Sequence, residues 1–310
     1  MLICLTSFLH AEATAQFGDP LEGSDLPRNS TLWKIGLSVA AVGGPCKGIY
    51  ATMPVPTDWP GQVVRVVDED ISGQVDRIKY RVLDNGVKQL LISIPQLESG
   101  TKAHAYVTFE VERQQLAPPA GVEDFVKPKR VPREIKRALG ASPFIESRSR
   151  QIRSLAKQLR DPELSDWEQV ELFYDYVRDN VEYQNGELKG ALAALQDGTG
   201  DCEELTSLFI ALCRAHGVPA RTVWVPDHCY PEFYLEDQEG VGYWIPCQAA
   251  GTRSFGTIPE LRPILQKGDN FKVPEKRDPQ RYVSEFLTGD AIKGGGRPRV
   301  KFKREELRAR

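Results

Sequence analysis

Alternating apolar and polar positions dominate the first third of the chain. Apolar side chains occupy every second position from Trp33 to Val39, which is the period of a half-buried strand. Two further alternating runs, Ile78–Val82 and Leu90–Ile94, flank the turn Asp84-Asn85-Gly86, as in a hairpin. Strands at this spacing predict an antiparallel β-sandwich over residues 32–113. This region offers no candidate chemistry, so we expect it to be an accessory domain.

The apolar period changes to three and four residues later in the chain, which predicts helices. The clearest helix has its apolar stripe at Leu205, Leu208, Phe209, Leu212 and Cys213. Asp201 is a good N-cap and Glu204 completes a capping box, while the sequence His216-Gly217 is a stop signal. A second capping box, Ser165-Asp166-Trp167-Glu168, opens a helix expected to support the first.

Cys202 lies in the first turn of the predicted helix, directly after the glycine-rich turn Gly198-Thr199-Gly200. A helix N-terminus stabilises a thiolate, and the thiolate is the nucleophilic form of cysteine. The neighbouring acidic residues at 201, 203 and 204 oppose this effect. A reactive Cys202 therefore needs a cationic partner.

The chain has only four histidines that could be this partner. His10 lies in an N-terminal segment that we expect to be removed, and His104 falls on the polar face of a predicted strand. His216 is at the far end of the helix, about 20 Å from Cys202 at 1.5 Å per residue. His228, at the start of a strand-like run, remains as the candidate. The alternative is a surface histidine without a catalytic role.

Four segments together resemble the transglutaminase-like superfamily, a rearranged relative of the papain-type cysteine peptidases. They are Gly200-Asp201-Cys202-Glu203-Glu204, the run from Leu208 to Arg221, the run from His228 to Tyr234, and Trp244-Ile245-Pro246. The resemblance covers about residues 165–250. It implies a fold of the α+β class, with the N-terminal antiparallel β-sandwich followed by a transglutaminase-like (papain-like) α+β domain over residues 161–290.

The family pattern also implies roles for individual residues. Cys202 becomes the nucleophile and His228 the general base and acid, while the third member, usually aspartate, falls on Gln248. Glutamine can orient an imidazole through its amide oxygen but supplies no charge to stabilise the imidazolium. A working triad is expected, and a catalytically inactive relative is the alternative.

The expected reaction is thiol-dependent amide acyl transfer through a Cys202 thioester, with the backbone N–H of Cys202 contributing to an oxyanion hole. Hydrolysis of a peptide or protein amide is the first hypothesis. The alternatives are a protein-glutamine transglutaminase, with an amine as acceptor, and a non-catalytic binding module. No cofactor is implied.

The strands that carry His228 and Gln248 predict a hairpin register. Placing these two residues opposite each other leaves residues 236–240 as a five-residue loop that contains a glycine. The same register sets Cys229 opposite Cys247, on the other face of the sheet. We expect either a buried pair of thiols there or, in an oxidising compartment, a disulfide.

The six cysteines suggest two other interpretations, and both fit poorly. A zinc site would draw on the residues Cys202, Cys213, His228, Cys229 and Cys247. The chain has no C-x-x-C knuckle, and Cys213 belongs to the apolar stripe, so we expect no metal. A disulfide framework is disfavoured because the cysteines are sparse and Cys46 has no evident partner.

The N-terminal segment suggests where the protein acts. Residues 1–15 combine an apolar run with the small-residue site Ala13-Thr14-Ala15, which is typical of a truncated export signal, although the basic region is missing. Export to a periplasmic or extracellular space is expected, or a cytoplasmic location if this run is not a signal. No run reaches the roughly 20 apolar residues of a membrane span.

Two basic segments remain. Residues 114–160 form a linker and helical connection rich in lysine and arginine. Nucleic-acid binding is disfavoured, because the net charge is −3 and no aromatic ladder accompanies the basic residues. A solvated surface is expected instead. The basic tail, residues 291–310, is expected to be mobile.

Overall fold

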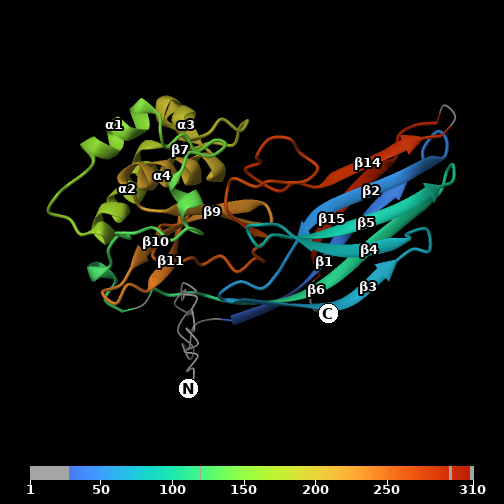
Figure 1. The fold of residues 1–310 in the computed structure, drawn as a ribbon, viewed down its shortest axis with the longest axis horizontal. Coiled ribbons are helices and arrows are strands. Elements are labelled where there is room, and N and C mark those ends of the chain that lie inside the picture. The colour runs from blue at the N-terminus through green and yellow to red at the C-terminus, as the bar shows by residue number, and fades with distance from the viewer. Residues whose placement is uncertain (1–27, 119, 293–294, 308–310) are drawn as a thin grey trace, which may run out of the picture.

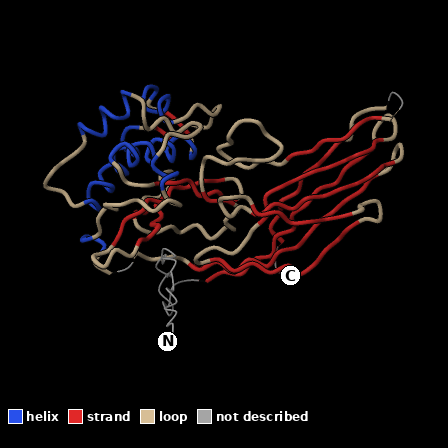
Figure 2. The backbone as a smooth tube through the Cα atoms, viewed as in Figure 1, coloured by secondary structure: helices blue, strands red, loops and turns tan. Residues whose placement is uncertain are grey.

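The computed structural model of the protein describes residues 28–118, 120–292 and 295–307. The candidate export signal at residues 1–15, with His10, lies outside the described residues. Within them, the chain forms an elongated β part and a mixed part that carries the helices (Figure 1). The tube view separates the two clearly, since the helices cluster at one end and the long strands at the other (Figure 2).

The β part is a sandwich of two four-stranded sheets, ordered β15-β1-β6-β3 and β14-β2-β5-β4. The strands of its N-terminal region are β1 (Arg28–Ala40), β2 (Cys46–Val55), β3 (Gln62–Ile71), β4 (Arg77–Val82), β5 (Lys88–Leu97) and β6 (Lys102–Gln114). Apolar side chains from both sheets, such as Leu37 and Ile92, fill one buried core. The predicted sandwich is confirmed, because the alternating positions point inward.

The prediction of a mobile tail over residues 291–310 is wrong for residues 299–307, which form a strand. Residues Phe286–Ala291 form β14, which pairs with β2, and Arg299–Leu307 form β15, which pairs with β1. Each strand completes one sheet of the sandwich, and in Figure 1 they lie beside the N-terminal strands. Val300 and Phe302 pack against the sandwich core. Arg299, Lys301 and Lys303 alternate with these apolar residues and lie on the outer face, whereas Arg304 is part-buried and paired with Glu285.

The mixed part is a five-stranded sheet covered on one face by helices. The strand order is β12 (Ser254–Phe255), β11 (Gly242–Gln248), β10 (His228–Glu236), β9 (Ala220–Val225) and β13 (Gln266–Lys267). The helices are α1 (Arg150–Gln158), α2 (Asp166–Asn180), α3 (Ala191–Asp197) and α4 (Cys202–His216). A two-stranded parallel pair, β7 (Glu182–Tyr183) and β8 (Thr199–Gly200), leads into α4.

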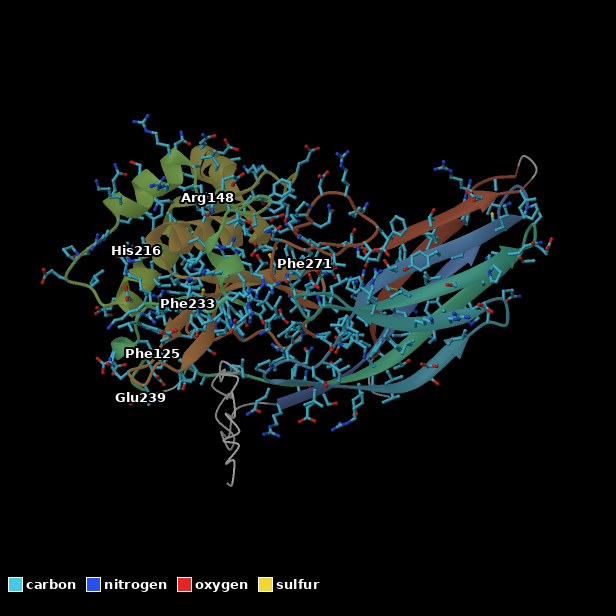
Figure 3. All side chains as sticks on the ribbon, viewed as in Figure 1. Phe125, Arg148, His216, Phe233, Glu239 and Phe271 are labelled. Atoms are coloured by element: carbon cyan, nitrogen blue, oxygen red, sulfur yellow. The ribbon has the colours of Figure 1, made fainter. Side chains whose placement is uncertain are left out.

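Helix α4 is the centre of this part. Its residues from Leu208 to Cys213 are fully buried, and they pack with α2 and with β10 in one core. Figure 3 labels Phe233 of β10, which belongs to this core, and His216, the last residue of α4. Both ends of the helix are fixed as expected: Asp201 and Glu204 form a capping box, and Gly217 ends the helix with φ +93°.

The predicted hairpin register is wrong by two residues. Glu232 pairs with Pro246 and Glu236 with Gly242, so the paired residue numbers sum to 478 rather than 476. Asp237 N–H donates to the Val241 carbonyl, which closes the hairpin over three residues rather than five. Its side chain also accepts from Glu239 N–H, an Asx turn that stabilises this tighter loop.

Because the register is wrong, the expected pairing of Cys229 with Cys247 is wrong as well. Cys229 pairs with Trp224 of β9, and Cys247 pairs with Phe255 of β12. Pro231 and Pro246 have no backbone N–H to donate, and the β10–β11 ladder ends beside them. Both cysteines are free and buried, so of the two alternatives the disulfide is not formed, but the thiols are not paired with each other across the hairpin.

The basic connection contains two short 3₁₀ helices, η1 (Val122–Asp124) and η2 (Lys136–Leu139). Its lysines and arginines lie mainly on the exposed side, as a solvated surface requires. Among the described residues, no helix is long and apolar enough to cross a membrane.

Candidate active site

Cys202 is the first residue of α4 and is partly exposed. The Asp201 carboxylate caps the helix and accepts a hydrogen bond from Glu203 N–H at 2.7 Å. The Cys202 N–H belongs to the first turn, whose donors have no intrahelical acceptor. Nucleophile and backbone donor therefore lie together at the helix end.

The turn before the helix is held by Glu204 and needs Gly200. Glu204 accepts from the backbone N–H of Asp201 at 3.2 Å and of Lys189 at 3.0 Å, so it ties the start of α4 to the preceding loop. A Cβ at Gly200 would lie 2.4 Å from the Glu204 Cβ, which is closer than two carbons can approach. This close contact explains the glycine immediately before the cap.

The surroundings of Cys202 favour its thiolate. The Cys229 thiol donates a hydrogen bond to the Cys202 sulfur, and the His228 ring donates another; together they outweigh burial and lower the pKa of Cys202 to about 4. The positive charge on His228 adds to this effect. The predicted cationic partner and the nucleophile are thus brought together.

His228 lies at the start of β10 and is half-buried beside Cys202, at the N-terminal end of α4. Burial alone would lower the pKa of its imidazole, but the hydrogen bond and the negative charge of Cys202 outweigh it, so the pKa is raised above its ordinary value. Its Nε2 is 3.4 Å from Gln248 Oε1. With Nε2 protonated, the ring donates to the amide and leaves Nδ1 for the sulfur.

Gln248 is itself positioned from α2. The Tyr174 hydroxyl donates to the Gln248 carbonyl at 2.8 Å, and Arg178 donates to the same oxygen at 3.0 Å. Arg178 also holds the carbonyls of Ala249 and Gly251. These contacts fix the backbone from which the Gln248 side chain reaches His228, although the two residues are not directly opposed in the sheet.

An open cleft of about 510 Å³ lies over His228 and Gln248. Its lining includes three residues that the sequence analysis missed, namely Tyr183, Asp227 and Arg262. Tyr183 pairs with Gly200 across β7 and β8, which places its half-exposed ring next to the nucleophile turn. Arg262 donates to the Pro226 carbonyl at 2.6 Å and is paired with Glu260.

Arg281 is a further residue near the site that the sequence did not reveal. It forms an ion pair with Glu203 and packs over the Trp224 ring at 5.0 Å. The segment that contains Arg281 has no regular apolar period, so its return to α4 could not be predicted. Loop residues placed by tertiary packing leave no periodic signal.

A second cavity, of about 320 Å³, is lined by Arg214, Arg221, Lys267 and neighbouring residues. Arg214 is twelve residues beyond Cys202 on α4, which is about 18 Å along a helix. Two of its buried charged groups are paired, Arg214 with Asp269 at 2.7 Å and Lys267 with Glu232 at 2.7 Å. This cavity therefore does not belong to the candidate active site.

The remaining histidines and cysteines lie elsewhere. His104 is paired with Asp70 at 2.8 Å on the sandwich, and His216 lies 3.2 Å from Lys127 Nζ at the far end of α4. Cys213 is fully buried, and burial raises the pKa of its thiol. In the part of the chain that the structure describes, no three His, Cys, Asp or Glu side chains are placed to hold a metal ion.

Comparison with known proteins supports the motif assignment. A sequence model of the transglutaminase-like superfamily matches residues 153–249. A search of curated proteins finds no significant match. A crystal structure from Cytophaga hutchinsonii, described as a candidate cysteine protease, has a TM-score of 0.56 and 18% identity, covering 92% of this chain and 93% of that chain.

Two further solved structures match with lower scores. The periplasmic domain of TgpA from Pseudomonas aeruginosa, bound to ethylmercury, has a TM-score of 0.37 and 14% identity over 72% of this chain and 90% of that one. A candidate protease from Parabacteroides distasonis has a TM-score of 0.30 and 12% identity over 76% and 48%. The family match confirms the resemblance for residues 153–249, which match the transglutaminase-like superfamily, and the Cytophaga hutchinsonii structure shares the fold.

Proposed function

We propose that this protein is a cysteine peptidase or amidase that cleaves a peptide or protein amide through a Cys202 thioester. The observation that carries the proposal is the contact of Cys202 with His228, whose ring also contacts Gln248 and lines an open cleft. A lowered thiol pKa and a raised imidazole pKa favour a thiolate–imidazolium pair near neutral pH.

The reaction then follows from the positions of these groups. The Cys202 thiolate attacks the amide carbonyl carbon, and backbone N–H groups at the start of α4 stabilise the oxyanion. The His228 imidazolium gives its proton to the leaving amine as the C–N bond breaks, leaving a thioester. Neutral His228 next takes a proton from water, which attacks the thioester and releases the carboxylic acid and the thiol.

The acyl acceptor distinguishes the proposed hydrolysis from transamidation. The purified chain should be incubated with a library of peptides in the presence of primary amines, and the products read by mass spectrometry. Cleaved peptides support hydrolysis, whereas amine adducts at glutamine side chains identify a transglutaminase. If both products are absent and Cys202 is unreactive, the protein is the non-catalytic binding module instead.

Two variants test the nucleophile directly. Cys202→Ala is expected to abolish both turnover and covalent labelling by an amide-mimicking electrophile, while Cys247→Ala, which removes a buried thiol of the same domain, should keep both. Circular dichroism checks that each variant is folded. Labelling of Cys202→Ala at wild-type stoichiometry would contradict the assignment.

The proposed site of action is an exported compartment, on the basis of the apolar run and small-residue site in residues 1–15. Fractionation of the producing cells, with N-terminal sequencing of the mature chain, tests this. A mature chain that begins just after Ala15 outside the cytoplasm supports export. A cytoplasmic chain that still begins at Met1 contradicts it.

A further inference from the structure

A second cysteine lies against the candidate nucleophile. Cys229 directly follows His228 on β10 and is 1% exposed. Its thiol donates to the Cys202 backbone carbonyl oxygen at 3.5 Å, and its side chain and backbone N–H are also hydrogen-bond partners of the Cys202 sulfur. The Cys229 thiol therefore lies against Cys202 where β10 meets the first turn of α4.

The two thiols differ in exposure and in charge. Cys202 is partly exposed at the helix end, while Cys229 lies behind it in the protein. Burial and the neighbouring Cys202 raise the pKa of Cys229, so it keeps its proton when Cys202 is ionised. An oxidant entering from solvent thus meets the Cys202 thiolate first, and thiolates are the form of cysteine that peroxides oxidise.

We infer that Cys202 and Cys229 form a redox pair, in which Cys229 is the resolving thiol for a hydroperoxide-oxidised nucleophile. This inference goes beyond the proposed hydrolysis and rests on it only for the reactivity of Cys202.

The chemistry has two steps. The Cys202 thiolate attacks one oxygen of the hydroperoxide, the O–O bond breaks, and the products are Cys202 sulfenic acid and an alkoxide or hydroxide. The Cys229 thiol then attacks the sulfenic sulfur, its proton leaves with the hydroxyl group as water, and a disulfide bond forms. Two thiol equivalents from a reductant such as dithiothreitol restore both cysteines.

The structure favours this route over further oxidation. Cys229 is already in hydrogen-bond contact with Cys202, so the resolving step requires only that the sulfurs approach to the disulfide length of about 2 Å. A second peroxide, by contrast, must reach the sulfenic acid from solvent. The disulfide would block catalysis but protect the nucleophile from irreversible oxidation.

The other cysteines of the domain provide matched controls. Cys213 and Cys247 are fully buried in the same core and are near each other rather than near Cys202. Cleavage after lysine and arginine places Cys202 with Cys213 in the peptide 190–214, and Cys229 with Cys247 in the peptide 222–253. A linked pair of these peptides must therefore be fragmented to identify the bonded sulfurs.

The test treats the reduced, purified full chain with hydrogen peroxide and measures both the linkage and the alkylation of Cys202 by iodoacetamide. The wild type and Cys247→Ala are expected to yield a Cys202–Cys229 disulfide, to lose alkylation, and to regain it with dithiothreitol. Cys229→Ala is expected to yield sulfinic and sulfonic acid at Cys202 and a loss of alkylation that dithiothreitol does not reverse.

Two results would overturn the inference. One is irreversible oxidation of Cys202 in the wild type at the rate seen in Cys229→Ala, with no linked peptides. The other is a linkage that fragmentation assigns to Cys213 or Cys247. A Cys202 that alkylates at low pH and cleaves peptides but forms no disulfide would refute the redox pair while leaving the proposed function intact.

Discussion

At the residue scale, the candidate site depends on three side chains with unequal support. Cys202 is held by a helix cap and His228 by the start of a strand, whereas Gln248 contributes only a neutral amide at 3.4 Å from the ring. A carboxylate at this position would orient the imidazole and also stabilise its positive charge. Position 248, where this chain has glutamine instead of the usual aspartate, is therefore the position at which a substitution can raise or lower activity.

Substitution of Gln248 tests this orienting role. Gln248→Asp is expected to preserve or raise kcat/KM, because the added charge stabilises the imidazolium. Gln248→Ala is expected to lower kcat/KM. General acid–base catalysis contributes about 10²–10⁴-fold to the rate, and the variant should lose part of that factor. Gln196→Ala, an exposed glutamine on α3, is the control and should leave kcat/KM unchanged. Wild-type kinetics in Gln248→Ala would show that another group orients His228.

The pH profile of turnover follows from the two shifted pKa values. Cys202 must be ionised to attack, so activity rises with pH through its lowered pKa of about 4. His228 must be protonated to release the amine, so activity falls as pH rises through its raised pKa. A bell-shaped profile of kcat/KM is expected, with its alkaline limb above the ordinary histidine value of about 6.5. A rate that only increases up to pH 9 would contradict this assignment of roles.

At the element scale, the position of Cys202 depends on how tightly the turn packs against the first turn of α4. Gly200→Ala is expected to lower the free energy of unfolding by about 1–3 kcal/mol, because its Cβ would collide with Glu204 and disturb the capping box. Gly186→Ala, where nothing lies within 4 Å, is the control. Denaturant unfolding measures both. Equal stability of the two variants would mean that Glu204 moves aside without cost.

Local signals predicted helix α4 well but predicted the pairing of strands β10 and β11 less well. The cap residues and apolar stripe of α4 all lie within one stretch of sequence, so the helix and the position of Cys202 in its first turn were predictable. The hairpin register was not, because a shift of two residues keeps every side chain on its own face and the apolar pattern cannot detect it. The Asx turn at Asp237 decided the register.

The contact between Cys229 and Cys202 was also beyond local reasoning. Strand alternation placed Cys229 on the opposite face from His228, together with Cys247. In the structure α4 packs on the face that Cys229 occupies, while His228, at the very start of β10, also interacts with Cys202. Cys229 and His228 therefore both contact the Cys202 sulfur.

At the scale of the whole molecule, the sandwich is completed by the two ends of the described chain. The alternation of Val300 and Phe302 with basic residues was the available signal for β15. It was obscured by the surrounding charge and the glycine run before it, and pairing with β1 spans most of the chain. Such long-range pairing cannot be inferred from a local pattern.

Truncation of one side chain tests the structural role of β15. Phe302→Ala is expected to destabilise the protein by about 1–3 kcal/mol, less than the about 3–5 kcal/mol of a fully buried phenylalanine, because Phe302 is partly buried against the sandwich core. Lys301→Ala, at the exposed neighbouring position, should change stability little. Thermal unfolding compares the two. Identical midpoints would indicate that β15 adds nothing to the stability of the sandwich.

The central claim is that Cys202 is a thiolate stabilised by His228, and the pH dependence of its alkylation tests this most directly. The rate of iodoacetamide labelling at Cys202 is measured from pH 4 to pH 10 by mass spectrometry, in the wild type and in His228→Ala. The wild type is expected to label readily at pH 6, with a midpoint far below the free thiol value of about 8.5. His228→Ala should move that midpoint upward. A wild-type midpoint near 8.5, unchanged by His228→Ala, would contradict the claim.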